Sequence, residues 1–301
     1  MTDVTTALNY STFGSFLLAM AFENNIRGSL TAVEKLMQNG GAQSKTTAAM
    51  ILFCNIVSMG TIATFACLRP FNPLNCVLLG ELTNIFFHIY MVSFSAFLLF
   101  KTWIITSKNV WFLGVSIILL LLRTAFALFD LRVSYYQVVA GTTTCTLTSD
   151  TTSPIAYVSA DIIADLICTV AACIMAYTHQ TNLDLRNVFA VFATENVLRS
   201  GFMLADNLLN LYLYTVGSTN PAIYFCYGLQ MYVTAQALNS EFNWVGARTR
   251  AVVDAMARMD ESNKGRDAER MVTVGSESSY TMDGQMTSQN SGFRVMKIYN
   301  H

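Results

Sequence analysis

Long apolar stretches recur along the chain, separated by short polar segments. A helix that crosses a membrane needs about 20 mostly apolar residues, because roughly 30 Å of hydrocarbon is covered at about 1.5 Å per residue. Apolar and polar residues do not alternate in these stretches, which is typical of helices and not of the strands of a membrane barrel. The pattern predicts six spanning helices, at Thr46–Leu68, Asn75–Trp103, Val110–Leu131, Pro154–Thr178, Leu185–Tyr214 and Asn220–Phe242.

A seventh apolar stretch, Tyr10–Phe22, is shorter than the other six. It reaches spanning length only if the helix begins near Thr6 and carries Glu23, Asn24 and Arg27 at its cytoplasmic end. A signal peptide and a helix lying on the membrane surface are the alternatives. The residues before the stretch contain no Lys or Arg, which argues against a signal peptide. We therefore predict an all-α membrane protein with a seven-transmembrane helix bundle in residues 1–245.

The regions outside these helices differ in composition. The outer loop from Arg132 to Ser153 is rich in Thr and Ser after Gly141, and we expect it to be extended and exposed. Residues 246–272 combine helical periodicity with dense charge, which predicts a short cytoplasmic helical segment. Residues 273–301 are rich in Ser, Thr, Gln and Asn, which predicts a disordered cytoplasmic tail that a kinase can modify.

Charge is scarce and unevenly distributed. Charged residues make up 12% of the chain and apolar residues 53%, whereas about a quarter of the residues in a soluble domain are charged. Loops rich in Lys and Arg stay in the cytoplasm, so we predict a cytoplasmic C-terminus, an outer N-terminus and a location in the plasma membrane. The positive loops contain Arg27, Lys35, Lys45, Lys101, Lys108 and Arg186, whereas the opposite loops contain only Arg69 and Arg132.

Ionisable side chains within the predicted helices are the strongest functional signal, because each costs at least about 2.5 kcal/mol at the bilayer centre. Four acids, Glu81, Asp130, Asp161 and Asp206, fall in the outer third of the membrane, and Asp165 lies one turn deeper than Asp161 on the same helix face. We predict that these acids form an acidic vestibule that binds a ligand. The acids outnumber the neighbouring arginines, so the excess must be protonated, hydrated or matched by a cation. Of these acids, the predicted ligand-binding residues are Glu81, Asp161, Asp165 and Asp206.

A second set of charges lies nearer the middle of the membrane. Glu195 and Arg199 are four residues apart on one helix, which favours an ion pair between them. Arg123 can pair with Asp165 or Asp130. We predict that Glu195, Arg199 and Arg123 have structural roles as paired charges.

Sequence signals for catalysis are lacking. The chain has no Gly-rich phosphate loop, no Ser elbow and no Cys–His nucleophile arrangement, so we expect no enzyme. Its three His residues are widely separated, and we expect no metal site and no cofactor. Covalent retinal needs a Lys in the last helix, yet Asn220–Phe242 has none, and we expect no Lys in the interior of any span. The Lys and Arg are dispersed and the net charge is −1, which argues against a nucleic-acid partner.

The predicted topology resembles that of the G-protein-coupled-receptor superfamily over residues 1–245. With seven helices, Cys76 begins the third helix on the outer side and Cys145 lies in the second outer loop. Many of these receptors have a disulfide between those two places, so the resemblance implies a Cys76–Cys145 disulfide. Cys67, near the outer end of the preceding helix, is the alternative partner of Cys145.

Two motifs depart from the receptor pattern. At the inner end of the third helix, where many receptors have an acidic-Arg-aromatic triplet, the chain has Phe100-Lys101-Thr102-Trp103. The last helix contains Asn220-Pro221-Ala222-Ile223-Tyr224, which matches the receptor Asn-Pro-x-x-Tyr string but lies at the opposite end of its helix. The departures leave the receptor subfamily and the coupling to a G protein open.

The preferred hypothesis is an integral membrane receptor that senses a small cationic ligand through the outer acids. The resemblance implies a heterotrimeric G protein as partner, beside the lipid bilayer and a kinase that acts on the tail. The alternative is a proton- or cation-coupled transporter or channel that uses the same carboxylates. That alternative needs a polar lining from face to face, whereas the predicted ionisable residues end about halfway. A structural role, with charges only for helix packing, is the third hypothesis.

Overall fold

A computed structural model describes residues 2–38, 42–68, 75–106, 108–138, 145–148, 152–178, 186–216, 222–245 and 253. The predicted cytoplasmic segment at 246–272, apart from residue 253, lies outside the described residues, as does the predicted tail at 273–301. The Asn220-Pro221 dipeptide of the receptor-like string also lies outside them.

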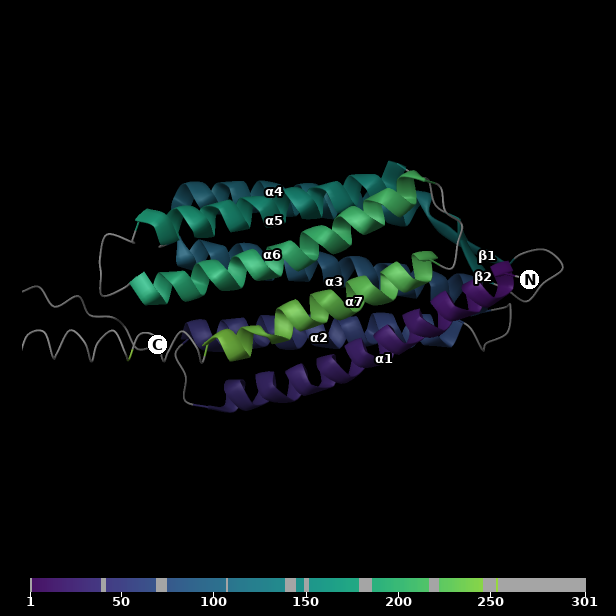
Figure 1. Cartoon of the computed structure of the whole chain (residues 1–301), viewed down its shortest axis with the longest axis horizontal. Helices are drawn as coiled ribbons and strands as arrows, with labels where there is room; N and C mark the ends of the chain where they lie inside the picture. Colours follow the sequence, from purple (N-terminus) through teal and green to yellow (C-terminus); the bar gives the residue numbers. More distant parts are fainter. Residues whose placement is uncertain are drawn as a thin grey trace, which may run out of the picture.

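Seven helices dominate the described part of the chain, and successive helices run antiparallel along one long axis (Figure 1). This confirms the all-α class. The bounds of the helices are α1 Thr2–Met37, α2 Ala42–Leu68, α3 Cys76–Ile105, α4 Val110–Val133, α5 Thr152–Thr178, α6 Arg186–Thr215 and α7 Ala222–Asn239.

The observed helices agree with the six predicted spans to within a few residues at each end, and the largest difference lies in α1. This helix continues well past Phe22 to Met37. The prediction that the first helix ends near Arg27 and that Lys35 belongs to a loop is wrong: both residues lie within α1, where Arg27 forms an exposed ion pair with Glu23 one turn earlier, at 2.5 Å. Neither Gly nor Pro interrupts the sequence strongly enough there to end the helix.

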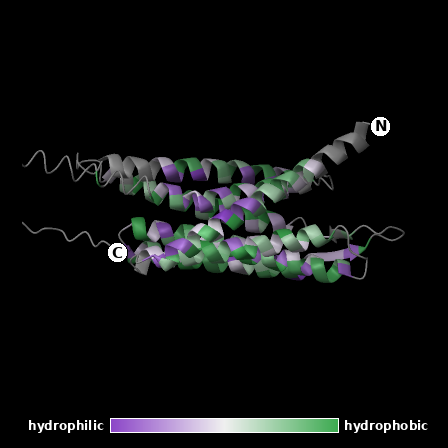
Figure 2. Ribbon diagram, turned by 90° about the horizontal axis from the view of Figure 1, so that it is seen from below, coloured by the Kyte–Doolittle hydropathy of each residue, from purple (hydrophilic) through white to green (hydrophobic). Residues whose placement is uncertain are grey.

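The seven helices form a closed ring that includes α3. Helix α1 packs against α2 and α7, α2 against α3, α5 against both α4 and α6, and α6 against α7. Helix α3 packs against α2, α4 and α5 (Figure 1). Polar groups on α3, α5 and α6 therefore face one shared interior, and Figure 2 shows hydrophilic positions along the middle of the bundle as well as at its ends.

A two-stranded antiparallel hairpin connects α4 to α5. Strand β1, Tyr135–Val138, pairs with β2, Cys145–Thr148, so that Val138 lies opposite Cys145. A disulfide joins Cys145 to Cys76 at the start of α3, with 5.7 Å between the Cα atoms, and Cys67 is a free thiol. This confirms the Cys76–Cys145 disulfide and the extended character of the loop around Cys145.

The hairpin also packs closely against α3. A Cβ atom on Gly80 would lie 2.1 Å from the Tyr136 ring, so only Gly allows the strand to approach this helix so closely. The start of α1 and the hairpin lie at the same end of the bundle (Figure 1). We name this end the hairpin end. The opposite end, where α7 finishes, is named the far end.

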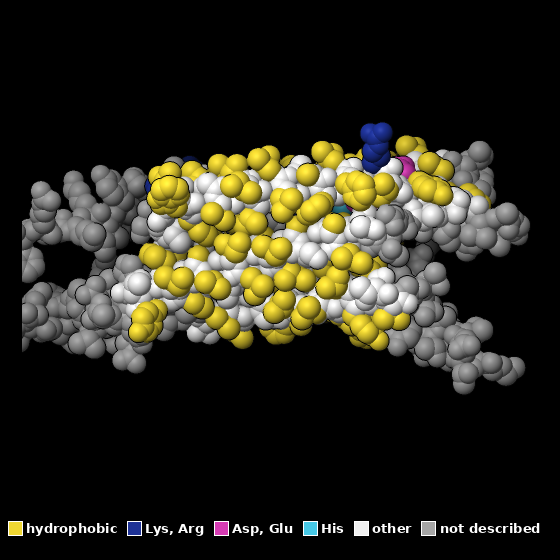
Figure 3. Space-filling view, turned by 90° about the horizontal axis from the view of Figure 1, so that it is seen from above, with side chains coloured by type: hydrophobic (Ala, Val, Ile, Leu, Met, Phe, Trp, Pro, Cys, Tyr) yellow, Lys and Arg dark blue, Asp and Glu magenta, His cyan; other side chains and the backbone are white. Residues whose placement is uncertain are grey.

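Large apolar side chains cover much of the outer surface. On α4, Trp111 is 88% exposed and Leu121 is 65% exposed. The face in Figure 3 is covered mainly by hydrophobic side chains, with few charged groups among the described residues. Four helices are long and apolar enough to cross a membrane, over Ser44–Cys67, Cys76–Ile105, Val110–Val133 and Thr152–Met175. The chain is therefore a helical membrane protein. Within the described residues, α1, α6 and α7 do not reach that apolarity.

Candidate functional site

Helix α6 has its polar face inside the bundle and its apolar face outside. Phe202 is 66% exposed, whereas Glu195 is 2% exposed. The buried polar residues recur every three or four positions, so they form one stripe along the helix. This stripe consists of Glu195, Asn196, Arg199, Ser200, Asp206, Asn207 and Asn210. A soluble helix has the opposite arrangement, with its apolar stripe on the core.

A buried charged cluster joins three parts of the chain near the far end. The Lys101 ammonium group on α3 donates to Glu195 on α6 and to Glu241, just after α7. Arg199 lies 3.8 Å from the same Glu195 oxygen and donates to Asn196 at 2.6 Å. All four ionisable side chains are at least nine-tenths buried. The far-end cluster, Lys101, Glu195, Arg199 and Glu241, contains two positive and two negative groups and is balanced as a set.

This cluster corrects two predictions made from the sequence. Lys101 is not a loop residue: it is buried inside α3, so the expectation that no helix has a Lys in its interior is wrong. Glu195 does not rely on Arg199 alone, since Lys101 is its closer partner. Glu241 received no role from the sequence because it lies at the end of the last predicted stretch, Asn220–Phe242, where charges usually face the headgroups.

A second ion pair lies between α4 and α5. Arg123 donates from Nε to Asp161 Oδ1 at 2.7 Å, and Ser95 on α3 donates to the same oxygen at 3.3 Å. The guanidinium group of Arg123 also lies over the ring of Tyr157, 5.1 Å from its centroid, where a cation is attracted by the π system. The predicted partners of Arg123, Asp165 and Asp130, are therefore wrong, because Asp161 takes that place.

Asp165 lies one helical turn from Asp161 and has a neutral partner. It accepts a hydrogen bond from Ser200 on α6 at 2.9 Å, and Ser200 also contacts the Thr169 hydroxyl. Asp165 is within electrostatic range of both Arg199 and Asp161. It therefore connects the Arg123–Asp161 pair to the far-end cluster.

Asp130 anchors the hairpin to α3. Its carboxylate lies 2.7 Å from His88 Nε2 and accepts a hydrogen bond from Asn84 at 3.3 Å. It also accepts from Ser134, directly before β1, and from Ser153 at the start of α5. Both ends of the loop that contains the hairpin are thus tied to one carboxylate. The ring of Tyr157 lies edge-on to His88, 5.3 Å between centroids, and links this anchor to Arg123.

These groups form a series of buried polar side chains along the bundle, which we name the polar column. It begins at the hairpin end and continues to the far end, and the axial separation of His88 and Lys101 on α3 is about 20 Å. The expectation that the ionisable residues stop halfway is therefore wrong. The column consists of Asp130, His88, Arg123, Asp161, Asp165 and the far-end cluster.

The two remaining predicted ligand-binding acids lie outside the column. Asp206 on α6 is buried, and Asn210 on the next turn donates to it at 3.4 Å, while its Oδ1 atom has no hydrogen-bond partner. Glu81 is half-buried near the start of α3. Asp161 and Asp165 line one cavity, and among the described contacts none joins Asp206 or Glu81 to them.

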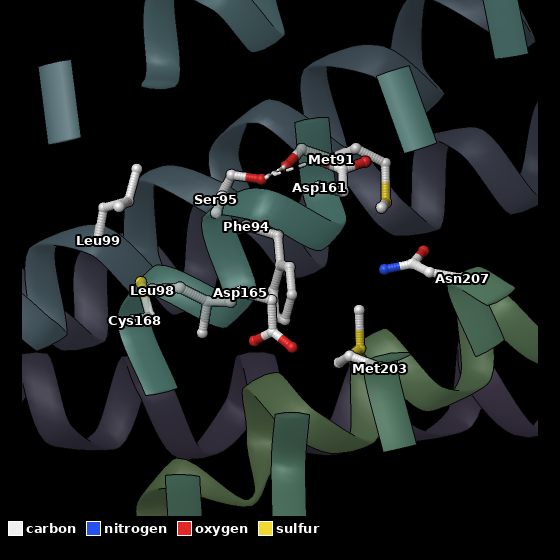
Figure 4. Close-up of a pocket in the computed structure, with 11 residues that line it drawn as sticks. Met91, Phe94, Ser95, Leu98, Leu99, Asp161, Asp165, Cys168, Met203 and Asn207 are labelled. Atoms are coloured by element: carbon white, nitrogen blue, oxygen red, sulfur yellow. Dashed lines mark hydrogen bonds between the residues drawn. The ribbon is translucent and has the colours of Figure 1, made fainter. Parts of the chain in front are cut away.

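A small cavity lies beside Asp161 and Asp165, between α3, α5 and α6 (Figure 4). Its volume is about 20 Å³, which is room for one particle of the size of water. Its polar lining consists of the two carboxylates, Ser95 and Asn207. The apolar lining includes Met91, Phe94, Leu98, Cys168 and Met203.

Among the described residues of this interior, buried acidic side chains outnumber buried basic ones. The buried carboxylates are Asp130, Asp161, Asp165, Glu195, Asp206 and Glu241, and the buried bases are Lys101, Arg123 and Arg199, beside His88. Isolated buried charges are strongly unfavourable, so the excess acids need protons or cations. Within the described part of the chain, no group of three or more His, Cys, Asp and Glu side chains could hold a metal ion.

Comparisons with known proteins identify no relative: no protein-family model matches the chain, and no curated protein is significantly similar to it.

Proposed function

We propose that the chain is a seven-helix membrane receptor of the G-protein-coupled-receptor type, in which α1, α6 and α7 cross the membrane together with the four apolar helices. Support comes from α6, which exposes Phe202 and buries Glu195. The polar residues that lower the apolarity of this helix face the interior and not the surroundings. Such a helix is compatible with lipid although its overall composition is polar.

The hairpin supports the same proposal. A disulfide ties it to the outer end of α3, as the resemblance to the receptor superfamily implies, and Asp130 fixes both of its ends. The hairpin then lies on the outer side, where disulfides persist. We propose that the C-terminus lies in the cytoplasm and the protein in the plasma membrane.

The observation that carries the proposal is the link from Lys101 to Glu195 and Glu241. A receptor needs a two-state element at its inner end whose equilibrium is changed by a ligand at the outer end. The far-end cluster joins α3, α6 and the end of α7 by charges that attract strongly in a low dielectric. Separation of α6 from α3 would break these contacts. The cluster therefore stabilises one of the two proposed states of the inner end, the state in which α6 lies against α3.

The proposed ligand is a small cation that enters at the hairpin end. The part of the interior that the structure describes has six buried carboxylates and three buried permanent cations, which favours a positively charged ligand over a negative one. Glu81 and Asp206 are proposed to attract it, and Asp161 and Asp165 to respond to it at the upper part of the polar column. A G protein at the far end and a kinase acting on residues 273–301 are the proposed partners.

A proton- or cation-coupled transporter is the second candidate. The observation that favours it is the length of the polar column, about 20 Å of the roughly 30 Å hydrocarbon core. Titratable groups in such a series can pass protons between neighbours.

Nucleotide exchange and ion flux measured on one preparation separate the two functions. The full chain is reconstituted with a panel of purified heterotrimeric G proteins, and binding of a GTP analogue is followed for the wild type and for the Lys101→Met/Glu241→Gln double variant. This variant removes the link between α3 and α6, while Arg199 and Glu195 keep the cluster neutral. The receptor proposal predicts that basal exchange increases several-fold. The matched control is Glu23→Gln/Arg27→Met, which changes an exposed ion pair and should leave exchange unchanged.

Proton- and cation-gradient flux in liposomes is measured with the same protein. Flux in the wild type, lost in Asp165→Asn, together with no exchange on any G protein, would establish the transporter and reject the receptor.

A further inference from the structure

Helix α1 lies at the edge of the bundle, where it packs mainly against α2 and α7 (Figure 1). An ion pair between Arg27 and Glu23 lies on α1 with the two side chains 76% and 62% exposed. Exposed apolar side chains lie beside the pair, since Ile26 is 40% and Leu30 68% exposed. The spacing of these four residues places them on one face of the helix. We name it the outer α1 face.

Contacts with α2 fix the depth of this face in the membrane. Asn25 donates to Ser58 of α2 at 2.7 Å. Ser58 lies about 21 Å along α2 from one end of its apolar segment, Ser44–Cys67, and about 14 Å from the other end. A second set of hydrogen bonds fixes the same register, and it joins Asn24, Asn55 and Asn239. Arg27 lies about 3 Å from Asn25 along α1, so the ion pair is near the middle of the hydrocarbon core.

Charged groups at this depth need a polar partner. The headgroups begin about 15 Å away on either side, which is too far for the Arg27 side chain to reach. Arg has five N–H donors, and among the described contacts Arg27 uses one of them, toward Glu23. Charged side chains in membrane helices almost always face protein or water and not lipid. The outer α1 face is therefore a surface that another polar membrane helix covers.

We propose that the outer α1 face binds the same face of a second copy of the chain. A two-fold axis along the membrane normal brings residues of equal depth together, and Glu23 lies one helical turn from Arg27. Glu23 of each copy can then pair with Arg27 of the other copy, which neutralises all four charges. Ile26 and Leu30 supply the apolar contacts beside them. A partner of another kind would need its own acid and base at this depth, whereas a second copy has both.

Oxidative cross-linking of the full chain in liposomes tests the contact. Leu30→Cys places a thiol on the outer α1 face. Leu121→Cys on α4 is the matched control, because Leu121 is 65% exposed and also lies near the middle of its helix. A short pulse of copper phenanthroline should convert Leu30→Cys to a covalent dimer. Leu121→Cys should stay at the level of the wild type, whose own free thiols set the background.

Neutralisation of the pair measures the contribution of the charges. Dimers are counted by single-molecule photobleaching over a range of protein-to-lipid ratios. Glu23→Gln/Arg27→Met should lower the association constant by about 3- to 30-fold, as the loss of polar contacts between membrane helices does. The control Arg132→Met removes an exposed Arg from α4 and should leave association unchanged. The pair lies outside the interior of each copy, so its neutralisation changes assembly and not basal nucleotide exchange.

Charge reversal tests whether the pairing is specific. Arg27→Glu leaves two acids on the face and Glu23→Arg leaves two bases, so each variant alone should stay monomeric. Differently labelled copies of the two variants should form mixed dimers when they are reconstituted together. If either variant fails to fold, the neutral variant and the cross-linking decide.

Three results would overturn the proposal: equal cross-linking of Leu30→Cys and Leu121→Cys, wild-type monomers at every protein density, or unchanged association in the neutral variant. The inference rests on the proposed function only for the position of α1 in the bilayer, and a tag at Met1 tests that position separately. Monomers with an outer Met1 tag would reject the interface and leave the receptor proposal intact. Specific cross-links with a cytoplasmic Met1 tag would keep the interface and reject the seven spans.

Discussion

Lys101 of α3 donates to Glu195 of α6, so the two helices are joined by a buried ion pair near the far end of the bundle. Glu241 accepts from the same ammonium group, which makes Lys101 the positive centre of a contact between three parts of the chain. In a low-dielectric interior such a group is difficult to remove alone, because its partners stay charged and buried.

Replacement of Lys101 by Met should therefore destabilise the protein by about 3 to 5 kcal/mol, since Glu195 and Glu241 would face only Arg199. The Lys101→Met/Glu241→Gln double variant restores the charge balance and should recover most of the loss. Thermal unfolding in detergent measures both. The exposed control Arg27→Met should change the stability by about 0 to 1 kcal/mol. Equal losses in the single and double variants would show that charge balance is not what Lys101 provides.

Asp161 and Asp165 should respond differently to the same substitution. Asp161→Asn removes the charged partner of Arg123. The buried guanidinium group then has no opposite charge beside it, at a cost of about 3 to 5 kcal/mol. Asp165→Asn keeps an oxygen that can accept from Ser200 and relieves the repulsion by Asp161, so its folded yield should match or exceed that of the wild type. Size-exclusion profiles and melting temperatures compare the two. If Asp161→Asn folded and Asp165→Asn did not, Asp165 and not Asp161 would be the acid that the folded structure requires.

The Cys76–Cys145 disulfide should resist alkylation until it is reduced, whereas Cys67 should react as a free thiol. Peptide mapping without reductant distinguishes them. Cys145→Ser should lower the stability by about 2 to 4 kcal/mol, because the disulfide closes a loop of 69 residues. Recovery of alkylated Cys145 from unreduced protein would contradict the pairing.

The contact between α1 and α7 requires Gly228. A Cβ atom there would lie 2.7 Å from the backbone oxygen of Gly14, and a backbone atom cannot move aside as a side chain can. Gly228→Ala should destabilise the protein by about 1 to 3 kcal/mol, as overpacking does. Gly201→Ala is the matched control: no atom lies within 4 Å of the added Cβ, so higher helix propensity should stabilise by about 0.5 to 1 kcal/mol. A melting temperature unchanged by Gly228→Ala would mean that the two helices are less closely packed.

Apolar periodicity predicts the helices well, because the length of an apolar stretch is a local property. It fails at α1, where Arg27 and Lys35 continue a helix that they were expected to end. It also cannot assign partners. Arg123 had several acids within reach along the sequence, and only the packing of α4 against α5 selects Asp161.

Lys101 illustrates the limit most clearly. A Lys near the end of an apolar stretch is equally typical of a headgroup contact and of a buried pair. The distinction depends on Glu195 and Glu241, which lie 94 and 140 residues away. The one usable signal was Glu195 itself: a buried acid in the middle of a helix needs a cation, and Arg199 at one turn is not its closest partner.

The central claim is that all seven helices cross the membrane around a charged interior. The most direct test is to determine on which side of the membrane each end of the chain lies. Tags are placed at Met1 and His301, and each is exposed to protease or antibody in intact and in permeabilised cells. Seven spans predict that the Met1 tag is accessible from outside and that the His301 tag is accessible only after permeabilisation. Both tags on the cytoplasmic side would leave an even number of spans and would contradict the seven-helix receptor.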